Sequence, residues 1–282
     1  MIKEKTGGLA MKKTKYLCFN TKILLCGLIL FVSALFLLTP ANSFAAKGKG
    51  GRVGEKVSFS SKEGFNITGL FVRPAGPGMK TFILLHGLAS SQDEWQGFVH
   101  DLTKHGYGFL SYDARGHGKS LIVQNGMKLT YDSFGPPAKN SNWEKMVSDL
   151  DSAVNFLITA KNIRPNKIGL IGASLGANVC LLYASNKDSV NPVVLLSPGI
   201  DYAGLNTNQA IFAFKGTKNK YRPIAIVASP NDTYAFQSAC YLYKQIESNK
   251  KSVLIQGQNS NHGVQMLDKT MVRKIFSWIN NY

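Results

Sequence analysis

A single serine, Ser174, stands between two glycines in the segment GASLG, residues 172–176. The apolar residues before it favour a β-strand over 167–171, and those after it favour a helix over 175–185. Glycines on both sides let the backbone turn sharply, which lifts the serine hydroxyl above the edge of the sheet. The N-terminus of the helix favours negative charge developing beside it. The pattern predicts a nucleophile at Ser174; the alternative is a tight strand-to-helix connection without chemistry.

A serine hydroxyl needs a base to remove its proton, and His262 is the candidate. It lies in the segment GQNSNHGVQML, between the last predicted strand (252–255) and the last predicted helix (264–279). This loop should lie at the same sheet edge as Ser174, because both follow the carboxyl end of a parallel strand. The alternative is that His262 only caps the last helix. Structural or surface positions are expected for the other histidines, His86, His100, His105 and His117.

The base in turn needs an acidic residue, which holds the imidazole in the right tautomer and stabilises the imidazolium that forms. Asp232 follows the predicted strand 224–228 in the segment IVASPNDTYAF. Asp201 follows the preceding strand in the segment LLSPGIDYA and is the alternative acid. A plain Asx-turn would also explain an aspartate at position 232. The turn after a late strand favours Asp232.

A tetrahedral intermediate also needs hydrogen-bond donors for its oxyanion, and two backbone N–H groups commonly supply them. Leu175, directly after the nucleophile, is the first candidate. Leu88 is the second, because it follows the predicted strand 81–85 and the dipeptide His86-Gly87. The glycine lets the backbone turn toward the site. The two leucine side chains have no part in this role.

Strands and helices alternate along the chain after residue 54, which predicts a mostly parallel sheet with helices on both faces. Most of the strands are nearly continuous apolar runs, as expected for strands that are buried on both faces. Strands are expected at 55–60, 65–73, 81–85, 107–112, 167–171, 193–196, 224–228 and 252–255, the first two as a hairpin. Helices are expected at 94–104, 143–161, 175–185, 233–247 and 264–279.

The first 46 residues have the pattern of a secretory signal peptide, which implies a secreted, periplasmic or cell-envelope protein. Lysines precede an uncharged apolar run over residues 23–38, and Ser-Phe-Ala at 43–45 offers small residues for cleavage before Ala46. An uncleaved N-terminal membrane anchor is the alternative, and Met11 is an alternative start. Residues 47–54, KGKGGRVG, are expected to be a flexible basic linker. Residues 55–282 are the predicted catalytic domain.

The formal net charge is +17, and the six lysines and one glutamate of the first 45 residues leave +12 on the remainder. The lysines are spread singly, without an arginine-rich or aromatic-interleaved stripe, so no nucleic-acid partner is expected. A solvated basic surface could associate peripherally with an anionic cell envelope. Cys180 and Cys240 are expected to be buried thiols or a single disulfide. No Cys/His cluster indicates a metal site.

These features together resemble the α/β-hydrolase superfamily from about Val57 to the end of the chain. The resemblance rests on LLHGLASSQDEW (84–95), YDARGHGKS (112–120), GASLG, PND and NHG, and on the order serine, aspartate, histidine. The first two segments are similar to the branch of monoacylglycerol lipases, lysophospholipases, small carboxylesterases and S33-type serine aminopeptidases. The resemblance implies an α/β-hydrolase fold with about eight mostly parallel strands. It implies the triad Ser174, Asp232 and His262.

The resemblance further implies that Leu88 and Leu175 donate to the oxyanion. It implies a structural role for the loop that contains Asp113, Arg115 and His117, which braces the site in relatives. The chain departs from many relatives because roughly 25 residues separate the strands 193–196 and 224–228, too few for a full helical cap. The irregular stretch 121–142 could partly replace one. Candidate pocket walls are Trp95, Tyr131 and Phe134, although apolar packing is the favoured interpretation for Trp95.

The sequence therefore predicts an exported serine hydrolase without metal or organic cofactor, and a carboxylesterase in particular. An open site favours small or accessible acyl esters as substrates. An S33-type peptidase would need carboxylates on a cap to bind a free amine, and an acyltransferase would use the same triad. A non-catalytic binding protein of the same fold is the remaining alternative. The acyl group, the alcohol and the oligomeric state are left open.

Overall fold

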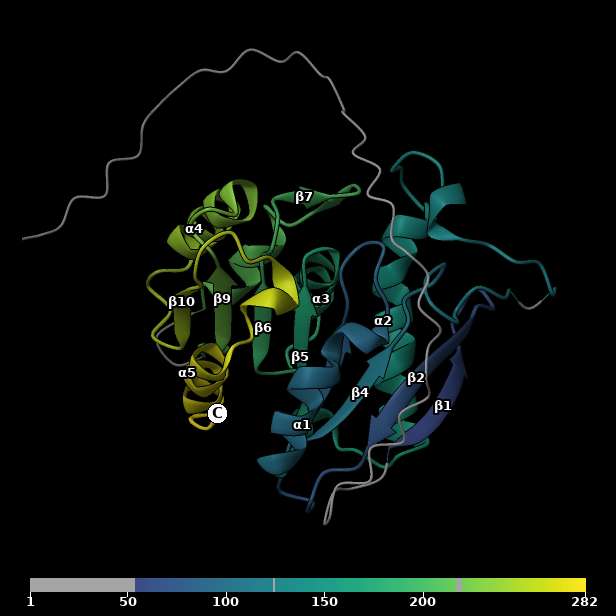
Figure 1. Cartoon of the computed structure of the whole chain (residues 1–282), viewed down its shortest axis with the longest axis horizontal. Helices are drawn as coiled ribbons and strands as arrows, with labels where there is room; N and C mark the ends of the chain where they lie inside the picture. Colours follow the sequence, from purple (N-terminus) through teal and green to yellow (C-terminus); the bar gives the residue numbers. More distant parts are fainter. Residues whose placement is uncertain (1–53, 124, 217–219) are drawn as a thin grey trace, which may run out of the picture. The chain divides into compact units, whose positions relative to one another are not determined.

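The computed structural model describes residues 54–123, 125–216 and 220–282 (Figure 1). The predicted signal peptide and most of the predicted linker lie outside the described residues. No helix within the described residues is long and apolar enough to cross a membrane.

One sheet of eight strands forms the centre of the described part of the chain, in the order β1-β2-β4-β3-β5-β6-β9-β10. The first two strands form the expected antiparallel hairpin, and β2 also pairs antiparallel with β4. All other neighbours pair parallel, which confirms the predicted α/β-hydrolase fold. The strands are β1 Glu55–Ser60, β2 Asn66–Val72, β3 Thr81–Leu85, β4 Gly108–Tyr112, β5 Ile168–Ala173, β6 Val193–Leu196, β9 Ile224–Ala228 and β10 Ser252–Gln256.

Helices cover both faces of this sheet. Successive strand residues point to opposite faces, and because both sets are apolar, each face packs against helices. Ile83 and Leu85 of β3 pack into the core beneath three helices, α2, α3 and α4. Phe82 and Leu84 point to the other core, which α1 and α5 cover. The helices are α1 Gln96–Lys104, α2 Asn142–Thr159, α3 Leu175–Ser185, α4 Thr233–Gln245 and α5 Lys269–Ile279. Cys180, on α3, is a buried free thiol, whereas Cys240, on α4, is only partly buried although the sequence predicts a buried position.

Two predicted helices begin later than expected. The predicted helix 94–104 starts with a 3-10 turn, Gln92–Trp95, and becomes α-helical only at Gln96. The predicted helix 264–279 is interrupted: Gly263–Met266 is a separate 3-10 turn, and α5 begins at Lys269. The physical reason is Asp268, whose carboxylate accepts a hydrogen bond from Met271 N at 2.7 Å and caps the new helix.

The segment between β6 and β9, which the sequence predicts to be too short for a full helical cap, contains a small hairpin. The segment after β6 forms β7 (Asp201–Tyr202) and β8 (Leu205–Asn206), followed by a 3-10 turn over Ala210–Phe214. The two short strands pair antiparallel (Figure 1). At the tip, a β-carbon on Gly204 would lie 2.5 Å from Pro137 Cβ. The hairpin therefore touches the irregular stretch 121–142, and together they cover part of the carboxyl edge of the sheet.

Candidate active site

Ser174 lies at the turn between β5 and α3 in a conformation that is rare for residues other than glycine, with φ of 52° and ψ of −119°. Its N–H donates to Leu196 O at 2.8 Å, which ties the turn to the neighbouring strand β6. The glycines on both sides are required by close packing. A β-carbon on Gly172 would overlap the backbone of Gly176, and one on Gly176 would overlap the carbonyl of Leu85. The local structure is the strained elbow that the GASLG pattern predicts.

His262 and Asp232 form the hydrogen-bonded pair that a triad needs. The Nδ1 atom of His262 lies 2.6 Å from Oδ2 of Asp232. The aspartate side chain is 17% exposed and the histidine side chain 38%, so the carboxylate is shielded while the imidazole can reach a substrate. A neutral imidazole in this geometry carries its proton on Nδ1 and leaves Nε2 free to accept one.

The loop of His262 is fixed against the strand that carries the serine. Gly263 N donates to Ser197 Oγ at 2.9 Å, just after β6. A β-carbon on Gly263 would lie 3.3 Å from Ala173 Cβ, so the residue after His262 contacts the residue before Ser174. The three predicted triad residues thus come together at one edge of the sheet. Their catalytic roles stay predictions.

Asp201, the alternative acid, serves another purpose. Its carboxylate accepts hydrogen bonds from Gly204 N at 2.8 Å and from Asn206 Nδ2 at 3.4 Å. Both partners belong to the β7–β8 hairpin, so Asp201 closes that turn. The structure pairs Asp232 with the histidine.

The predicted oxyanion loop passes directly over the nucleophile. A β-carbon on Gly87 would lie 3.3 Å from Ser174 Cβ and 4.0 Å from its Oγ. Leu88, whose N–H is the predicted donor, follows and exposes 48% of its surface. Leu175 is the first residue of α3, so its N–H has no acceptor one turn earlier in the helix. The N–H groups of Leu88 and Leu175 remain the predicted donors to an oxyanion at Ser174.

Two side chains, the partly buried Glu94 and the buried His86, hold this loop in place. Glu94 Oε1 accepts from Gly87 N at 3.1 Å, and burial raises the pKa of Glu94 although the nearby His262 opposes this shift. His86 Nε2 accepts from Ala114 N at 2.9 Å, while its Nδ1 lies 2.7 Å from Gly87 O. Burial lowers the pKa of His86 to about 3, so the ring stays neutral and donates from Nδ1. No motif in the sequence indicates this role of Glu94.

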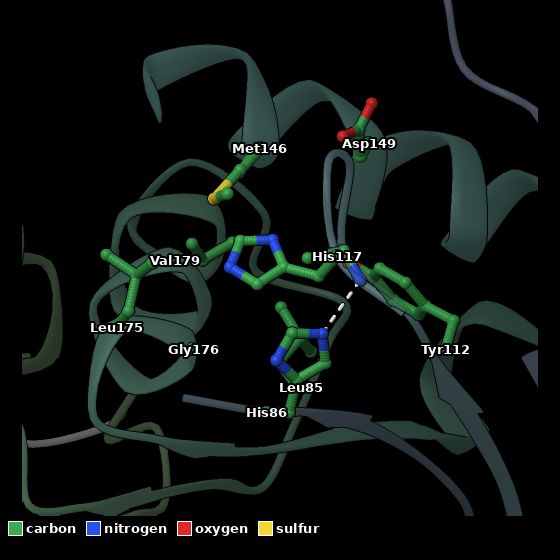
Figure 2. Close-up of a pocket in the computed structure, with 10 residues that line it drawn as sticks. Leu85, His86, Tyr112, His117, Met146, Asp149, Leu175, Gly176 and Val179 are labelled. Atoms are coloured by element: carbon green, nitrogen blue, oxygen red, sulfur yellow. Dashed lines mark hydrogen bonds between the residues drawn. The ribbon is translucent and has the colours of Figure 1, made fainter. Parts of the chain in front are cut away.

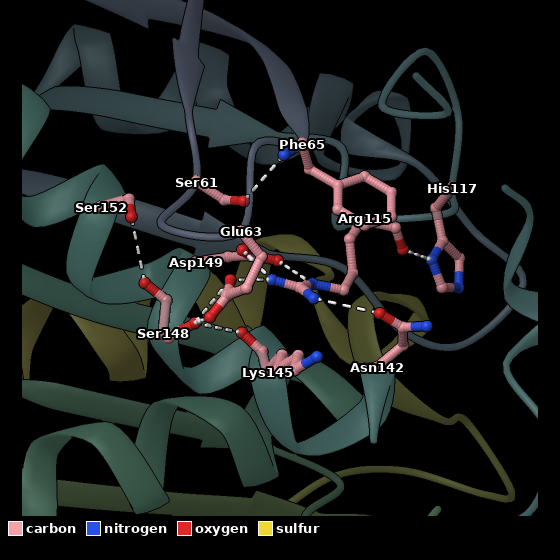
Figure 3. Close-up of polar contacts among 10 residues, drawn as sticks. All are labelled: Ser61, Glu63, Phe65, Arg115, His117, Asn142, Lys145, Ser148, Asp149 and Ser152. Carbon is pink, nitrogen blue, oxygen red and sulfur yellow. Dashed lines mark hydrogen bonds and ion pairs between the residues drawn. The ribbon is translucent and has the colours of Figure 1, made fainter. Parts of the chain in front are cut away.

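The segment with Asp113, Arg115 and His117 has the bracing contacts expected of it. Arg115 is fully buried and holds Asp149 of α2 through two hydrogen bonds of 2.6 Å (Figure 3). Its Nη2 also reaches Glu63 at 2.8 Å, in the turn between β1 and β2. Asp113 accepts from the backbone N–H groups of residues 92 and 119, both at 2.8 Å. These contacts tie the N-terminal hairpin, the β4 loop and α2 together beside the site.

A cavity behind the oxyanion loop is too small for an acyl chain. It leaves about 10 Å³ for the centre of a water molecule, which is room for roughly one water (Figure 2). His117 borders it with an Nε2 atom that is buried without a hydrogen-bond partner, and burial lowers the pKa of this histidine. The lining residues are Leu85, His86, Tyr112, Ala114, His117, Met146, Asp149, Leu175, Gly176 and Val179.

The three candidate pocket walls are instead packing residues. Trp95 is fully buried among the residues of α1, in agreement with the apolar packing that the sequence favours for it. Phe134 packs edge-on against Trp143 at 5.0 Å between ring centres. Tyr131 stacks on the ring of His117 at 4.4 Å. These contacts dock the stretch 121–142 onto the loop that braces the site.

Two functional candidates escaped the sequence analysis. Tyr202 of β7 is partly buried, and its hydroxyl donates to the backbone oxygen of Ser197 at 3.5 Å, the residue whose side chain anchors the His262 loop. Asn178, one helical turn after Ser174 on α3, is fully buried and bonds to the backbone of Gly199 and Leu205. A polar residue inside the otherwise apolar run of α3 was the signal for Asn178. In the described residues no group of three or more His, Cys, Asp and Glu side chains could hold a metal ion.

Comparison with protein families places this site in context. The model of the serine aminopeptidase S33 family matches residues 77–273, more than half of the chain. The protein belongs to this family of hydrolases. The match includes all five predicted site residues, Ser174, Asp232, His262, Leu88 and Leu175.

Two curated relatives are similar to this chain over part of their length. YfhR of Escherichia coli K12, described as an uncharacterized protein, is 26% identical over 163 residues, 56% of this chain and 51% of its own. YqkD of Bacillus subtilis 168, also described as uncharacterized, is 33% identical over 132 residues, 46% of this chain and 38% of its own. The chain spans about half the length or less of these curated relatives.

Solved structures share the fold at low sequence identity. The esterase Pf2001 of Pyrococcus furiosus is 20% identical with a TM-score of 0.65, covering 82% of this chain and 93% of its own. A dienelactone hydrolase from Anabaena variabilis is 17% identical with a TM-score of 0.58, covering 81% and 98%. A predicted CIB-like hydrolase from Thermoplasma acidophilum is 13% identical with a TM-score of 0.61, covering 82% and 100%. At these identities the likeness supports the α/β-hydrolase fold alone.

Proposed function

We propose that the protein is a serine hydrolase that cleaves small or accessible carboxylic esters through an acyl-enzyme. The observation that carries this proposal is the 2.6 Å pair of Asp232 and His262, held at the sheet edge where Ser174 stands in a strained elbow. Strain of this kind at a nucleophile is typical of a preorganised active site. An esterase is also among the structures that share this fold.

The chemistry follows from the positions of the side chains. His262 Nε2 takes the proton of Ser174 as the serine oxygen bonds to the ester carbonyl carbon. The oxyanion then accepts hydrogen bonds from the N–H groups of Leu88 and Leu175. His262 passes its proton to the departing alcohol, and Asp232 stabilises the imidazolium throughout. Water attacks the acyl-enzyme by the reverse proton path and releases the acid.

The experiment is hydrolysis of p-nitrophenyl esters from acetate to palmitate by the purified protein, by Ser174→Ala and by Ser277→Ala. Ser277 is an exposed serine of α5, so its substitution is a matched control. We expect Ser174→Ala to lose at least about a thousandfold in kcat and the control to keep wild-type rates. No hydrolysis of any ester, with no labelling of Ser174 by a fluorophosphonate, would contradict the proposal.

An aminopeptidase is the second candidate, because the family is described as serine aminopeptidase S33. The same triad would attack an amide, but a free amino terminus needs a carboxylate to bind it. Aminoacyl p-nitroanilides, assayed beside the esters, separate the two activities. Labelling of Ser174 without turnover of either class would instead favour an acyltransferase.

We also propose that the protein is exported, on the evidence of its first 46 residues. Its expected partner is a small-molecule ester rather than a nucleic acid. The net charge of +12 after residue 45 supports peripheral attachment to an anionic envelope. The intact mass of protein recovered from cells distinguishes cleavage before Ala46 from a retained anchor.

A further inference from the structure

The alcohol part of an ester has a defined place in a site of this kind. His262 Nε2 has to protonate the departing alcohol oxygen, so the alcohol lies beside His262 during the reaction. The carbonyl oxygen is held elsewhere, by the oxyanion donors, which therefore do not select the alcohol. The residues next to His262 and next to its partner Asp232 are the ones placed to contact the alcohol.

Two short loops lead up to these two residues, 257–261 before the histidine and 229–231 before the aspartate. They are joined directly, because Asn231 N donates to Asn259 O at 3.1 Å. The backbone of Asn259 is left-handed, with φ of 55°. The two loops thus form one continuous border beside the His–Asp pair.

The side chains that this border exposes are polar and uncharged. Gln258, Asn259, Ser260 and Asn231 are exposed, and within the described residues their side chains have no hydrogen-bond partner. An amide offers two donor hydrogens and an acceptor, and a hydroxyl both donates and accepts. Neither loop contains Asp, Glu, Lys or Arg. The border can therefore bind hydroxyl groups, and it offers no counter-charge to an ammonium or a carboxylate group.

An exposed aromatic ring follows on the other side of Asp232. Tyr234, in the first turn of α4, is 48% exposed. Its hydroxyl donates to Asp201 O at 2.9 Å and accepts from Asp201 N at 3.0 Å. Its ring also packs edge-on against Tyr202, with 5.5 Å between ring centres. A ring that is fixed and still exposed offers an apolar surface to the C–H groups of an alcohol.

We propose that the alcohol part of the substrate is a polyhydroxylated alcohol, a sugar or a glycerol, whose free hydroxyl groups bind the amide side chains of Asn231 and Asn259. The proposal rests on the function proposed above and names its substrate class. The reaction itself is unchanged: the acyl group passes to Ser174 Oγ, and the alcohol oxygen leaves with the proton that His262 carries. A site that hydrogen-bonds hydroxyl groups discriminates against an alcohol that lacks them.

The first test compares acetate release by the wild type from ethyl acetate, glycerol monoacetate and glucose monoacetate. Each kcat/KM is divided by the rate of hydroxide-catalysed hydrolysis of the same ester, which removes differences in intrinsic reactivity. We expect the hydroxylated esters to exceed ethyl acetate by about tenfold or more, as for two or more added hydrogen bonds. A preference for glucose monoacetate alone assigns a sugar, and one for glycerol monoacetate alone assigns a glycerol. Equal corrected values for the three esters overturn the proposal.

The second test combines Asn231→Ala with Asn259→Gly, where glycine keeps the left-handed backbone and removes the amide. We expect kcat/KM on the preferred hydroxylated ester to fall about tenfold or more. The value for p-nitrophenyl acetate should stay within about twofold of the wild type, because p-nitrophenol has no second hydroxyl group. Asn155→Ala, at an exposed position of α2, is the matched control and should change neither value. A parallel loss on both esters overturns the proposal, and so does an unchanged preference.

The p-nitrophenyl esters separate this proposal from the function on which it rests. If the wild type hydrolyses p-nitrophenyl acetate and Ser174→Ala does not, equal corrected rates on the three acetates reject the polyhydroxylated alcohol alone. A wild type that hydrolyses no ester and is not labelled at Ser174 by a fluorophosphonate rejects the proposed function as well.

Discussion

At the scale of single residues, the two candidate acids differ in what their carboxylates contact. Asp232 meets the Nδ1 atom of His262 at 2.6 Å, and its side chain is only 17% exposed. The carboxylate oxygens of Asp201 accept hydrogen bonds within the turn of the β7–β8 hairpin. A partly buried carboxylate on Nδ1 fixes the tautomer that leaves Nε2 as the base. The two aspartates should therefore respond differently to the same isosteric change.

We predict that Asp232→Asn lowers kcat by about 10³- to 10⁴-fold, because an amide favours the wrong tautomer of His262. Asp201→Asn should keep most of the activity, since an amide oxygen still accepts from Gly204 N. Steady-state kinetics on one p-nitrophenyl ester, with thermal melting of both variants, checks the prediction. An equal loss in the two variants would count against the assignment of the acid.

Residue roles that depend on chain order could be predicted from the sequence, whereas those set by tertiary contact could not. Ser174 and His262 each follow a predicted strand, so their common sheet edge could be inferred. Tyr202 lies in the two-residue strand β7, which no periodicity indicates, and the hairpin that carries it is anchored by the tertiary contacts of Asn178. Glu94 reaches the oxyanion loop through a turn that no periodicity indicates.

At the scale of elements, close packing at the elbow places strict limits on side-chain size. Gly176 lies in the first turn of α3 against the carbonyl groups of Leu85 and His86, so β3 and α3 meet without space for a β-carbon. This contact brings the oxyanion loop to the nucleophile. Its backbone does not require glycine by conformation, since Gly176 is not among the residues with positive φ. Only the close approach requires it.

We predict that Gly176→Ala lowers the free energy of unfolding by about 2–4 kcal/mol, because the added methyl group displaces β3 or α3. Gly97→Ala is the matched control: Gly97 lies near the start of α1, and no atom lies within 4 Å of a β-carbon there. That substitution should raise the free energy of unfolding by about 0.5–1 kcal/mol. Urea denaturation of both variants measures the difference. Equal effects of the two changes would contradict the packing argument.

The bounds of an element could be predicted where a long apolar pattern defines it. They could not be predicted as well where a short polar signal, such as a helix cap, determines the first residue. All eight strands of the sheet occur within a residue or two of their predicted places. The last helix was predicted to start at 264, but Asp268 caps it and α5 starts at Lys269. Hydrophobic spacing alone does not distinguish a 3-10 turn from the first turn of a helix.

At the scale of the whole molecule, the two edges of the sheet have different tasks. The carboxyl edge holds the predicted triad. At the amino edge Lys80, just before β3, is buried and donates to Asn191 O at 2.8 Å and Asn166 O at 3.4 Å. Those carbonyls precede β6 and β5, so one ammonium group joins the amino ends of three neighbouring strands. Changes at Lys80 should therefore affect stability and spare the chemistry.

Burial, reinforced by the charge of Lys167, lowers the pKa of Lys80 from its usual 10.5 to about 8. The unfolded chain then binds this proton more tightly than the folded chain. Burying the charged Lys80 therefore lowers the free energy of unfolding by its full amount below pH 8, and this cost has disappeared above pH 10.5. We predict that between these limits Lys80 raises the free energy of unfolding by about 1–2 kcal/mol, solvent screening included.

Lys80→Met should lack this rise, because its side chain carries no proton to lose. Lys274→Met, at an exposed position of α5, should retain the wild-type pH dependence. Urea denaturation of the three proteins from pH 7.5 to 10.5 measures the slope in each. Ester hydrolysis at pH 7.5 should be unchanged by Lys80→Met, since the substitution lies at the edge opposite Ser174. If the free energy of unfolding of Lys80→Met rises with pH as steeply as that of the wild type, groups other than Lys80 set the stability of the fold at alkaline pH.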